Sequence, residues 1–155
     1  MRISLSNGGY TTVDAKHFDN LSKYRWYKNK NGYACRRSSR GGVVKTVWIH
    51  REVKGNPNKH FKIDHINGEK LDNRLSNLRL CTQQQNSCNR KIGKNNTSGY
   101  KGVYRRFDDK KWVASITYKG KILYLGSFED ITEAVNRYNS KALELHGEFA
   151  LVNKL

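Results

Sequence analysis

Residues Ile63 to Asn86 read IDHINGEKLDNRLSNLRLCTQQQN, and the sequence places its chemistry in this stretch. The Asp64-His65 dipeptide comes first, and Asn77 and Asn86 follow it. Asp and Asn oxygens are hard ligands that suit Mg²⁺ or Mn²⁺. A histidine beside them can act as a general base near neutral pH. The stretch therefore predicts one divalent metal ion and a nearby base.

The same stretch predicts a strand–loop–strand–helix unit. Residues 61–65 form one expected strand, the polar loop at 67–70 reverses the chain, and residues 77–81 form the second strand. Thr82 and Gln85 make a T-x-x-Q capping box, which is a sequence signature of a helix N-terminus. The unit gathers side chains from a strand pair and from the start of a helix.

Four side chains of this unit have separable roles in phosphodiester hydrolysis. Asp64 and Asn86 can offer oxygens to one cation, which would polarise the phosphodiester and stabilise charge on the leaving 3′ oxygen. His65 points to the opposite face of the strand from Asp64 and can work on the water. The amide oxygen of Asn77 can hold the imidazole in one tautomer. An alternative stays open, in which Asn77 is a turn residue and Asn86 a solvated helix position.

The chain is strongly basic, with a formal net charge of +17 over 155 residues. Such a charge favours phosphate polymers or anionic membranes as partners. No apolar run approaches the roughly 20 residues that span a bilayer, and the N-terminal MRISLSNGGY lacks the apolar stretch of a secretory signal. The basic residues alternate with strand-like aromatic residues, and an amphipathic basic helix is missing. Nucleic acid is therefore the expected partner, with no membrane.

The cysteines do not suggest a metal site. Cys35, Cys81 and Cys88 form no CxxC pair and no repeated ligand spacing. Their odd number predicts reduced thiols in a cytosol-like compartment. A zinc-stabilised nucleic-acid binder is accordingly a weak alternative.

Residues 2–49 are expected to be β structure, because short runs rich in aromatic and β-branched residues alternate with Gly and Asn clusters. Trp26 and Trp48 are expected core anchors. Residues 36–40 are expected at a hairpin tip, and residues 49–53 as a short helix. The tip arginines are either a solvated loop or a phosphate contact, and both interpretations stay open for Arg36, Arg37 and Arg40.

From Gly99 onward the pattern predicts three strands, at residues 100–107, 111–118 and 121–128, joined by tight turns at 108–110 and 119–120. Asp130 begins an expected helix that ends near His146, before Gly147. The helix should cover the sheet side carrying Trp112, Ala114, Ile116, Leu123 and Leu125. The other side is left for a DNA ligand, and it carries Tyr104, Arg106, Lys111, Thr117 and Tyr124.

Residues 49–91 resemble the HNH endonucleases of phage and intron homing enzymes. The matching motifs are IHREV with His50, KIDHINGEKLDN, SNLRLCT and QQQN. The resemblance implies a ββα-metal unit in which Asp64 and Asn86 bind one divalent cation, His65 is the general base and Asn77 holds it. The last family position is often His and here is Asn, which leaves an oxygen ligand. His50 then resembles a supporting histidine.

Residues 97–153 resemble the AP2/ERF DNA-binding domain through NTSGYKGVY, KWVASI, YLGSF, EAVNRY and LHGEFALVN. The resemblance implies that the three-stranded sheet enters the major groove. Several family arginines are replaced by Tyr, Thr or Ser, so the binding mode carries over better than any target sequence. The positions that match DNA contacts are Lys101, Tyr104, Arg106, Ser115, Thr117 and Tyr124.

The sequence thus predicts an α+β fold: an HNH nuclease domain at 1–92 with its ββα-metal core at about 61–91, a linker at 93–98, and an AP2-like domain at 99–155. The expected function is a Mg²⁺- or Mn²⁺-dependent homing-type endonuclease that nicks double-stranded DNA, with no small-molecule cofactor. The alternative is a sequence-specific DNA-binding regulator whose nuclease unit is inactive. We expect a monomer or a DNA-induced dimer in the cytoplasm of a phage-infected bacterial host.

Overall fold

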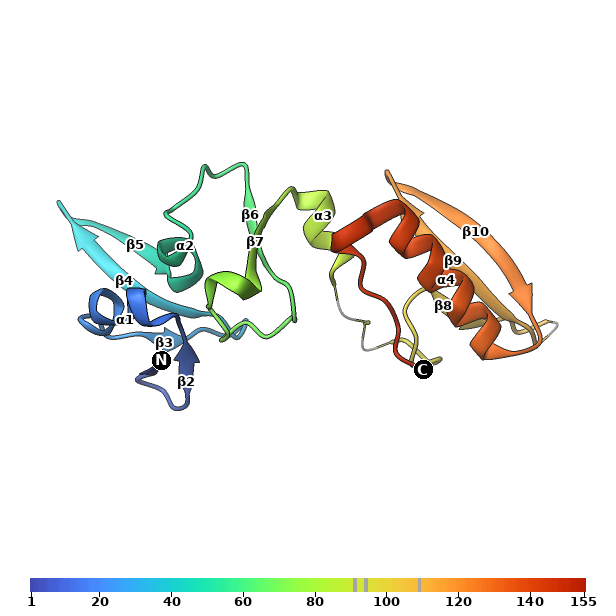
Figure 1. The fold of residues 1–155 in the computed structure, drawn as a ribbon, viewed down its shortest axis with the longest axis horizontal. Helices are drawn as coiled ribbons and strands as arrows, with labels where there is room; N and C mark the ends of the chain where they lie inside the picture. The colour runs from blue at the N-terminus through green and yellow to red at the C-terminus, as the bar shows by residue number, and fades with distance from the viewer. Residues whose placement is uncertain (91, 94, 109) are drawn as a thin grey trace. The chain divides into compact units, whose positions relative to one another are not determined.

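The computed structural model describes residues 1–90, 92–93, 95–108 and 110–155 (Figure 1). The chain divides into two compact units, Met1–Gln83 and Gln84–Leu155. Several small antiparallel sheets and a few helices make up the fold, which confirms the expected mixture of strands and helices. The domain boundaries at 92 and 98 stay predictions. Lys91 and Lys94, at the expected boundary and in the expected linker, and Asp109, in the expected turn, lie outside the described residues.

The first unit contains three small sheets. β1 (Arg2–Ser4) pairs with β2 (Tyr10–Thr12), and β6 (Lys62–His65) pairs with β7 (Leu78–Cys81). The third sheet holds β3 (Tyr27–Lys28), β4 (Ala34–Arg40) and β5 (Val43–Trp48). The helical elements of this unit are α1 (Ala15–Ser22), α2 (Ile49–Val53) and the 3₁₀ turn η1 (Leu75–Asn77). The predicted short helix at 49–53 and the predicted strand pair around Asp64 are confirmed.

Two predictions for residues 2–49 are wrong. Residues 15–22 form the helix α1, because Phe18 and Leu21 lie three positions apart on one helical face and pack into the core. Residues 36–40 lie along strand β4, and the hairpin tip is Gly41-Gly42. Both glycines have positive φ, +58° and +76°, as the central residues of a type I′ turn require.

The core of the first unit surrounds Trp26, which has no exposed surface. Its indole Nε1 donates a 2.7 Å hydrogen bond to the carbonyl oxygen of Leu21, so burial leaves its N–H satisfied. Trp26 is therefore the core anchor that was expected. Trp48 is only half-buried and lies against Tyr33 and His50. The β1–β2 pair and α1 pack onto the same core, which places the N-terminal segment beside the β6–β7 hairpin.

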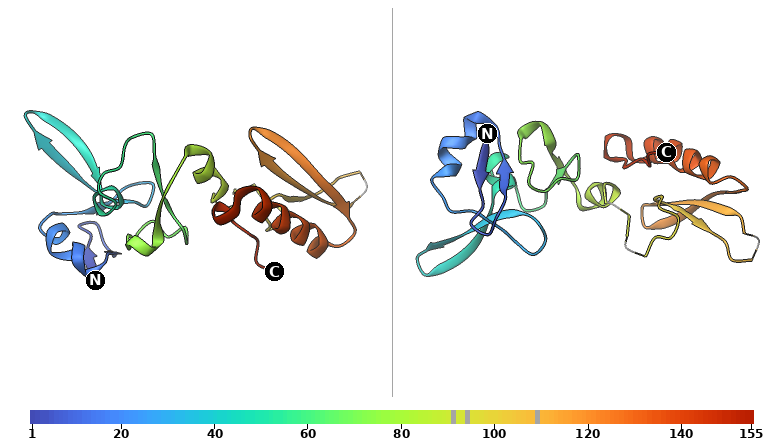
Figure 2. Two further views of the ribbon diagram at one scale, coloured as in Figure 1. Left: turned by 45° about the horizontal axis from the view of Figure 1, so that its top comes forward. Right: turned by 90° about the horizontal axis from the view of Figure 1, so that it is seen from below.

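The second unit is an antiparallel sheet in the order β10-β9-β8 with one long helix. Figures 1 and 2 show that α4 lies along one face of the sheet. Val135 and Tyr138 of α4 pack with Ala114 and Ile116, as the helical pattern predicted. Asp130 caps the start of α4 by accepting from the backbone N–H of Thr132. The elements are α3 (Gln83–Cys88), β8 (Val103–Arg105), β9 (Trp112–Tyr118), β10 (Lys121–Phe128), α4 (Ile131–His146) and the 3₁₀ turn η2 (Gly147–Phe149).

Among the described residues, no helix combines the length and the apolar character that crossing a membrane requires.

Candidate active site

The β6–β7 hairpin carries the Asp64-His65 dipeptide. Asp64 faces Arg79 across the strand pair, and His65 faces Leu78. Successive side chains of a strand point to opposite faces, so the carboxylate and the imidazole leave β6 in different directions. Both residues are buried, with 7% of Asp64 and 4% of His65 exposed. Buried polar side chains need partners, and those partners define the site.

Asp64 is held by an ion pair with its cross-strand neighbour Arg79. The guanidinium donates from Nη2 at 2.7 Å and from Nε at 2.9 Å, both to Oδ2 of Asp64. Burial, with the charge of Asp64 as a further cause, raises the pKa of Tyr33 and raises that of Cys81 to about 11. Arg79 was missed by the sequence interpretation, because the strand ranges 61–65 and 77–81 do not by themselves fix the register that sets Arg79 opposite Asp64.

His65 is held by Asn73, a residue with no exposed surface. Oδ1 of Asn73 lies 3.2 Å from Nε2 of His65, and Nδ2 of Asn73 donates to Oγ1 of Thr11 at 2.7 Å. The Thr11 hydroxyl donates its own hydrogen to the carbonyl oxygen of Leu71 at 2.8 Å. Because that hydroxyl hydrogen is already used, Thr11 can only accept from Asn73.

This chain of hydrogen bonds sets the tautomer of His65. With Nδ2 of Asn73 directed to Thr11, the amide oxygen faces the imidazole, so Nε2 must carry the hydrogen. Nδ1 is then the nitrogen that holds the lone pair. Burial lowers the pKa of His65 below its ordinary value, although Asn73, Asp64 and Asp72 oppose the shift. The imidazole is therefore neutral near neutral pH, which is the state that a general base requires.

Asn77 organises the loop between the two strands. Its Oδ1 accepts from the backbone N–H of Asn67 at 3.0 Å, and its Nδ2 donates to the carbonyl oxygen of Asp72 at 2.8 Å. This loop carries Asn73, whose backbone N–H donates to Thr12 of β2 at 2.8 Å. The described hydrogen bonds of Asn77 thus hold the loop that carries Asn73, and Asn73 in turn contacts His65. Direct holding of His65 by Asn77 stays a prediction.

Two aromatic rings lie against His65. The ring of His50 lies edge-on to His65 with centroids 5.5 Å apart, and the ring of Tyr33 lies at 5.9 Å. His50 also stacks on Trp48 at 5.9 Å. Burial, then the charges of His65 and Arg51, lower the pKa of His50 to about 3. His50 is therefore a neutral ring that packs against His65, and the supporting role that the resemblance implied stays a prediction.

Asn86 lies in α3, beyond the end of the first compact unit. Its joint ligation of a metal with Asp64 therefore stays a prediction. Among the described residues, no group of three or more His, Cys, Asp or Glu side chains could hold a metal ion. The predicted ligand pair, Asp64 and Asn86, differs from such a group because it combines one carboxylate with one carboxamide oxygen.

The three arginines of β4 differ in their surroundings. Arg36 donates to Oε1 of Glu52 at 2.8 Å and lies over the ring of Tyr24, so its side chain is largely buried. Arg37 and Arg40 are exposed. A DNA contact by Arg36 would require this ion pair to open, whereas Arg37 and Arg40 can meet a phosphate as they stand.

The predicted DNA-binding residues of the second unit differ in exposure and in their partners. Tyr104, Arg106, Thr117 and Tyr124 are exposed, and half-buried Lys111 pairs with Glu129 at 3.1 Å. The ammonium of Lys101 donates to the carbonyl oxygen of Cys88, and Lys101 and Thr117 line one pocket.

Comparisons with known proteins show which family the β6–β7 hairpin belongs to. Residues 45–88 match the family described as HNH endonuclease, and this range includes both strands of the hairpin. The chain is 33% identical over 158 residues to an HNH endonuclease of Acanthamoeba polyphaga mimivirus, covering 99% of this chain and 79% of the relative. A second HNH endonuclease of that virus is 31% identical over 112 residues, covering 70% of this chain and 30% of its own length.

A phage protein is also similar. Protein 3.8 of Escherichia phage T7 is 40% identical over 92 residues, which cover 59% of this chain and 75% of that protein. The chain belongs to the HNH endonuclease family. It is a nuclease, and the family implies DNA as the substrate and, in general, dependence on a divalent metal.

Proposed function

We propose that this chain is a Mg²⁺- or Mn²⁺-dependent endonuclease of the homing type that nicks duplex DNA. Asp64 and Asn86 would hold the metal, and His65 would be the general base. The hydrogen-bond chain from Thr11 through Asn73 to His65 carries the proposal, because it leaves Nδ1 of a neutral imidazole as the basic atom. One such base per chain supports cleavage of one strand in each event.

The donor chemistry of the proposed metal site fits a small hard cation. Mg²⁺ keeps several waters and binds through one or two carboxylates together with substrate phosphates. A metal site made of one carboxylate, from Asp64, and one amide oxygen, from Asn86, would match this pattern. Arg79 partly neutralises Asp64, so the metal affinity should be modest until a phosphate arrives. When bound, the cation would neutralise charge on the phosphodiester and on the leaving oxygen.

The work of His65 is to move one proton. Nδ1 accepts a proton from a water whose oxygen attacks the phosphorus, and the bond from phosphorus to the 3′ oxygen breaks. The leaving oxygen then takes a proton from solvent. Asn73 holds the ring while His50 and Tyr33 limit its rotation, so the base does not have to be ordered when substrate binds.

For the second unit, we propose an AP2/ERF-like sheet that positions the duplex. α4 covers one sheet face, so the other is available to a ligand. Tyr104 is 48% exposed and Tyr124 63% exposed, and Arg106 and Thr117 are exposed as well. Basic and aromatic side chains on an open face suit a β-sheet reader of a DNA groove. Phosphate contacts by Arg37 and Arg40 of β4 would add to the footprint.

Relaxation of a supercoiled plasmid tests the metal-dependent chemistry. Wild type should convert plasmid to the open-circle form with Mg²⁺ or Mn²⁺ and fail with a chelator. Asp64→Ala and Asn86→Ala should each raise the metal concentration needed for half-maximal cleavage. Cleavage that is unchanged by chelation would overturn the metal assignment, and linear product without prior open circles would overturn nicking.

A further inference from the structure

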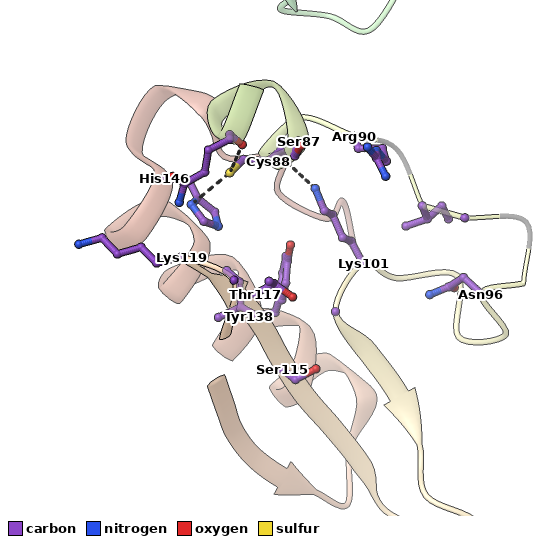
Figure 3. A pocket seen from close by; sticks show the side chains of 16 residues that line it. Ser87, Cys88, Arg90, Asn96, Lys101, Ser115, Thr117, Lys119, Tyr138 and His146 are labelled. Carbon is purple, nitrogen blue, oxygen red and sulfur yellow. Dashed lines mark hydrogen bonds between the residues drawn. The ribbon is translucent and has the colours of Figure 1, made fainter. Parts of the chain in front are cut away.

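A pocket of about 530 Å³ lies in the second unit, and none of its lining residues is among those proposed for catalysis (Figure 3). Its walls come from α3, the segment before β8, the end of β9 with the turn that follows it, and α4. Arg90, Lys101, Lys119 and His146 line it, and its described lining contains no Asp or Glu. A cavity with cations and no carboxylate favours an anionic ligand.

Lys101 is the cation that points into this pocket. Figure 3 shows its side chain reaching toward Cys88, whose carbonyl oxygen accepts from the ammonium. Burial, with the charge of Arg90 as a further cause, lowers the pKa of Lys101. Withdrawing an ammonium from water is costly without a countercharge. A bound anion would supply that charge.

The backbone around Lys101 is held in place before any ligand arrives. Asn153 accepts from the Lys101 N–H at 2.7 Å and donates to its carbonyl oxygen at 3.0 Å. Asn139 of α4 in turn bonds the backbone of Asn153 at 2.8 and 3.0 Å. At Gly102, a Cβ would lie 2.1 Å from the Tyr138 ring, so only glycine lets the segment approach α4 this closely. The position of Lys101 is therefore preorganised.

The size and mixed lining of the pocket narrow the class of ligand. A volume of 530 Å³ falls within the range of about 300–1,000 Å³ that is usual for small-molecule sites, and it exceeds the needs of a phosphate ion. Ile92, Ile116 and the ring of Tyr138 add apolar surface, while Ser115 and Thr117 add hydroxyl groups. We propose that this pocket binds one nucleotide, with its phosphate at Lys101 and its base against the apolar wall.

The nucleotide could come from two sources, a free mononucleotide or one unit of a nucleic-acid strand. The strand source rests on the proposed DNA substrate, whereas the pocket itself does not. Cys88 provides a reporter, because its Sγ lies in the pocket 3.4 Å from Nδ1 of His146. Cys35 and Cys81 are each only 1% exposed, so Cys88 is the accessible thiol.

The test measures the alkylation rate of Cys88 by iodoacetamide in the full chain, read by mass spectrometry, with a chelator present. The ligands are inorganic phosphate, dAMP, deoxyadenosine and a short single-stranded oligonucleotide. We expect dAMP or the oligonucleotide to slow alkylation and deoxyadenosine to fail. Lys101→Met should weaken this protection about tenfold or more, as expected for a lost charge-assisted hydrogen bond. Lys154→Met, which removes the same charge at an exposed site outside the pocket, should leave it unchanged.

Protection by dAMP identifies a free nucleotide as a ligand, and protection by the oligonucleotide alone identifies a strand. Both outcomes support the pocket. Equal protection by dAMP and deoxyadenosine, equal protection in wild type and Lys101→Met, or no protection by any phosphate ligand would each overturn it. No cleavage or metal is involved in this readout, so its failure and a failure of the nuclease proposal remain distinct.

Discussion

Asn73 and His65 are joined in the interior of the first unit, with Oδ1 of the amide 3.2 Å from Nε2 of the imidazole. This contact, directed by Thr11 on the far side of the amide, makes Nδ1 the proton-accepting atom of His65. The position of the proposed base therefore depends on an N-terminal strand that lies far from it in the sequence.

Replacing Asn73 tests that relationship. Asn73→Ala should lower kcat about 10- to 100-fold, as the loss of a supporting hydrogen bond to a catalytic histidine typically does, with little change in KM for DNA. ¹⁵N NMR of wild type should show His65 with its hydrogen on Nε2, and the variant should show a mixture of tautomers. Thr11→Val should act in the same direction. The control is Asn20→Ala on the exposed side of α1; an equal loss there, or a pure tautomer in Asn73→Ala, would contradict the assignment.

Removing Arg79 should destabilise the first unit, and this loss of stability should depend on the concentration of Mg²⁺. Arg79→Met leaves the buried Asp64 carboxylate without this cation, which should cost about 3 kcal/mol in the free energy of unfolding. Millimolar Mg²⁺ should restore part of the loss, because a cation that binds only the folded chain stabilises it. Urea unfolding with and without Mg²⁺ measures both effects.

The matched control is Arg74→Met, because Arg74 pairs with Asp72 while half of its side chain remains exposed. Arg74→Met should lower the free energy of unfolding much less than Arg79→Met does, and added Mg²⁺ should not change this effect. Equal losses in the two variants would mean that the Asp64 ion pair contributes no more than a surface contact.

His50 should make the fold sensitive to acid. Its pKa is about 3 in the folded chain and 6.5 in an ordinary environment. Between these two pH values, His50 is therefore protonated in the unfolded chain and neutral in the folded chain. The contribution of neutral His50 to the free energy of unfolding is present above pH 6.5 and is lost as pH falls toward 3. His50→Phe keeps an aromatic ring at this position but removes the titrating group. The free energy of unfolding should therefore fall less between neutral pH and about pH 4.5 in the variant than in wild type, by on the order of 2 kcal/mol. Urea titrations at both pH values measure it, and a slope as steep as that of wild type would refute it. His60→Phe, at an exposed histidine, is the control.

Arg106 tests the open sheet face of the second unit. Arg106→Met should weaken DNA binding by a similar factor on all sequences and lower the salt slope of log K by about 1, if the residue meets a phosphate. Fluorescence anisotropy at several salt concentrations measures both quantities. Arg137→Met on α4 removes the same charge away from that face. A drop of the same size in both variants would indicate a general effect of net charge.

The elements that carry Asp64 and His65 were predictable, because alternation and turn residues are local signals. The same holds for α4, whose cap at Asp130 and apolar face are both visible in sequence. α1 was missed because a helix of eight residues shows only Phe18 and Leu21 among polar neighbours.

Asn73 was missed for a different reason. In the sequence it is one of several loop asparagines, alongside Asn67 and Asn77, and only its contact with Thr11, 62 positions away, distinguishes it. Lys101 was predicted as a DNA contact from the AP2 resemblance, but the clamp by Asn153 that directs it into the pocket spans 52 positions. Long-range hydrogen bonds of this kind leave no periodic trace in a single sequence.

The role of His65 as general base is tested most directly by single-turnover nicking of a supercoiled plasmid by His65→Ala, compared with wild type and with His60→Ala. Wild type and His60→Ala should nick at similar rates with Mg²⁺. His65→Ala should be slower by about 100-fold or more, as loss of a general base requires, and added imidazole should restore part of the rate. Nicking by His65→Ala at the wild-type rate would show that His65 is not the base.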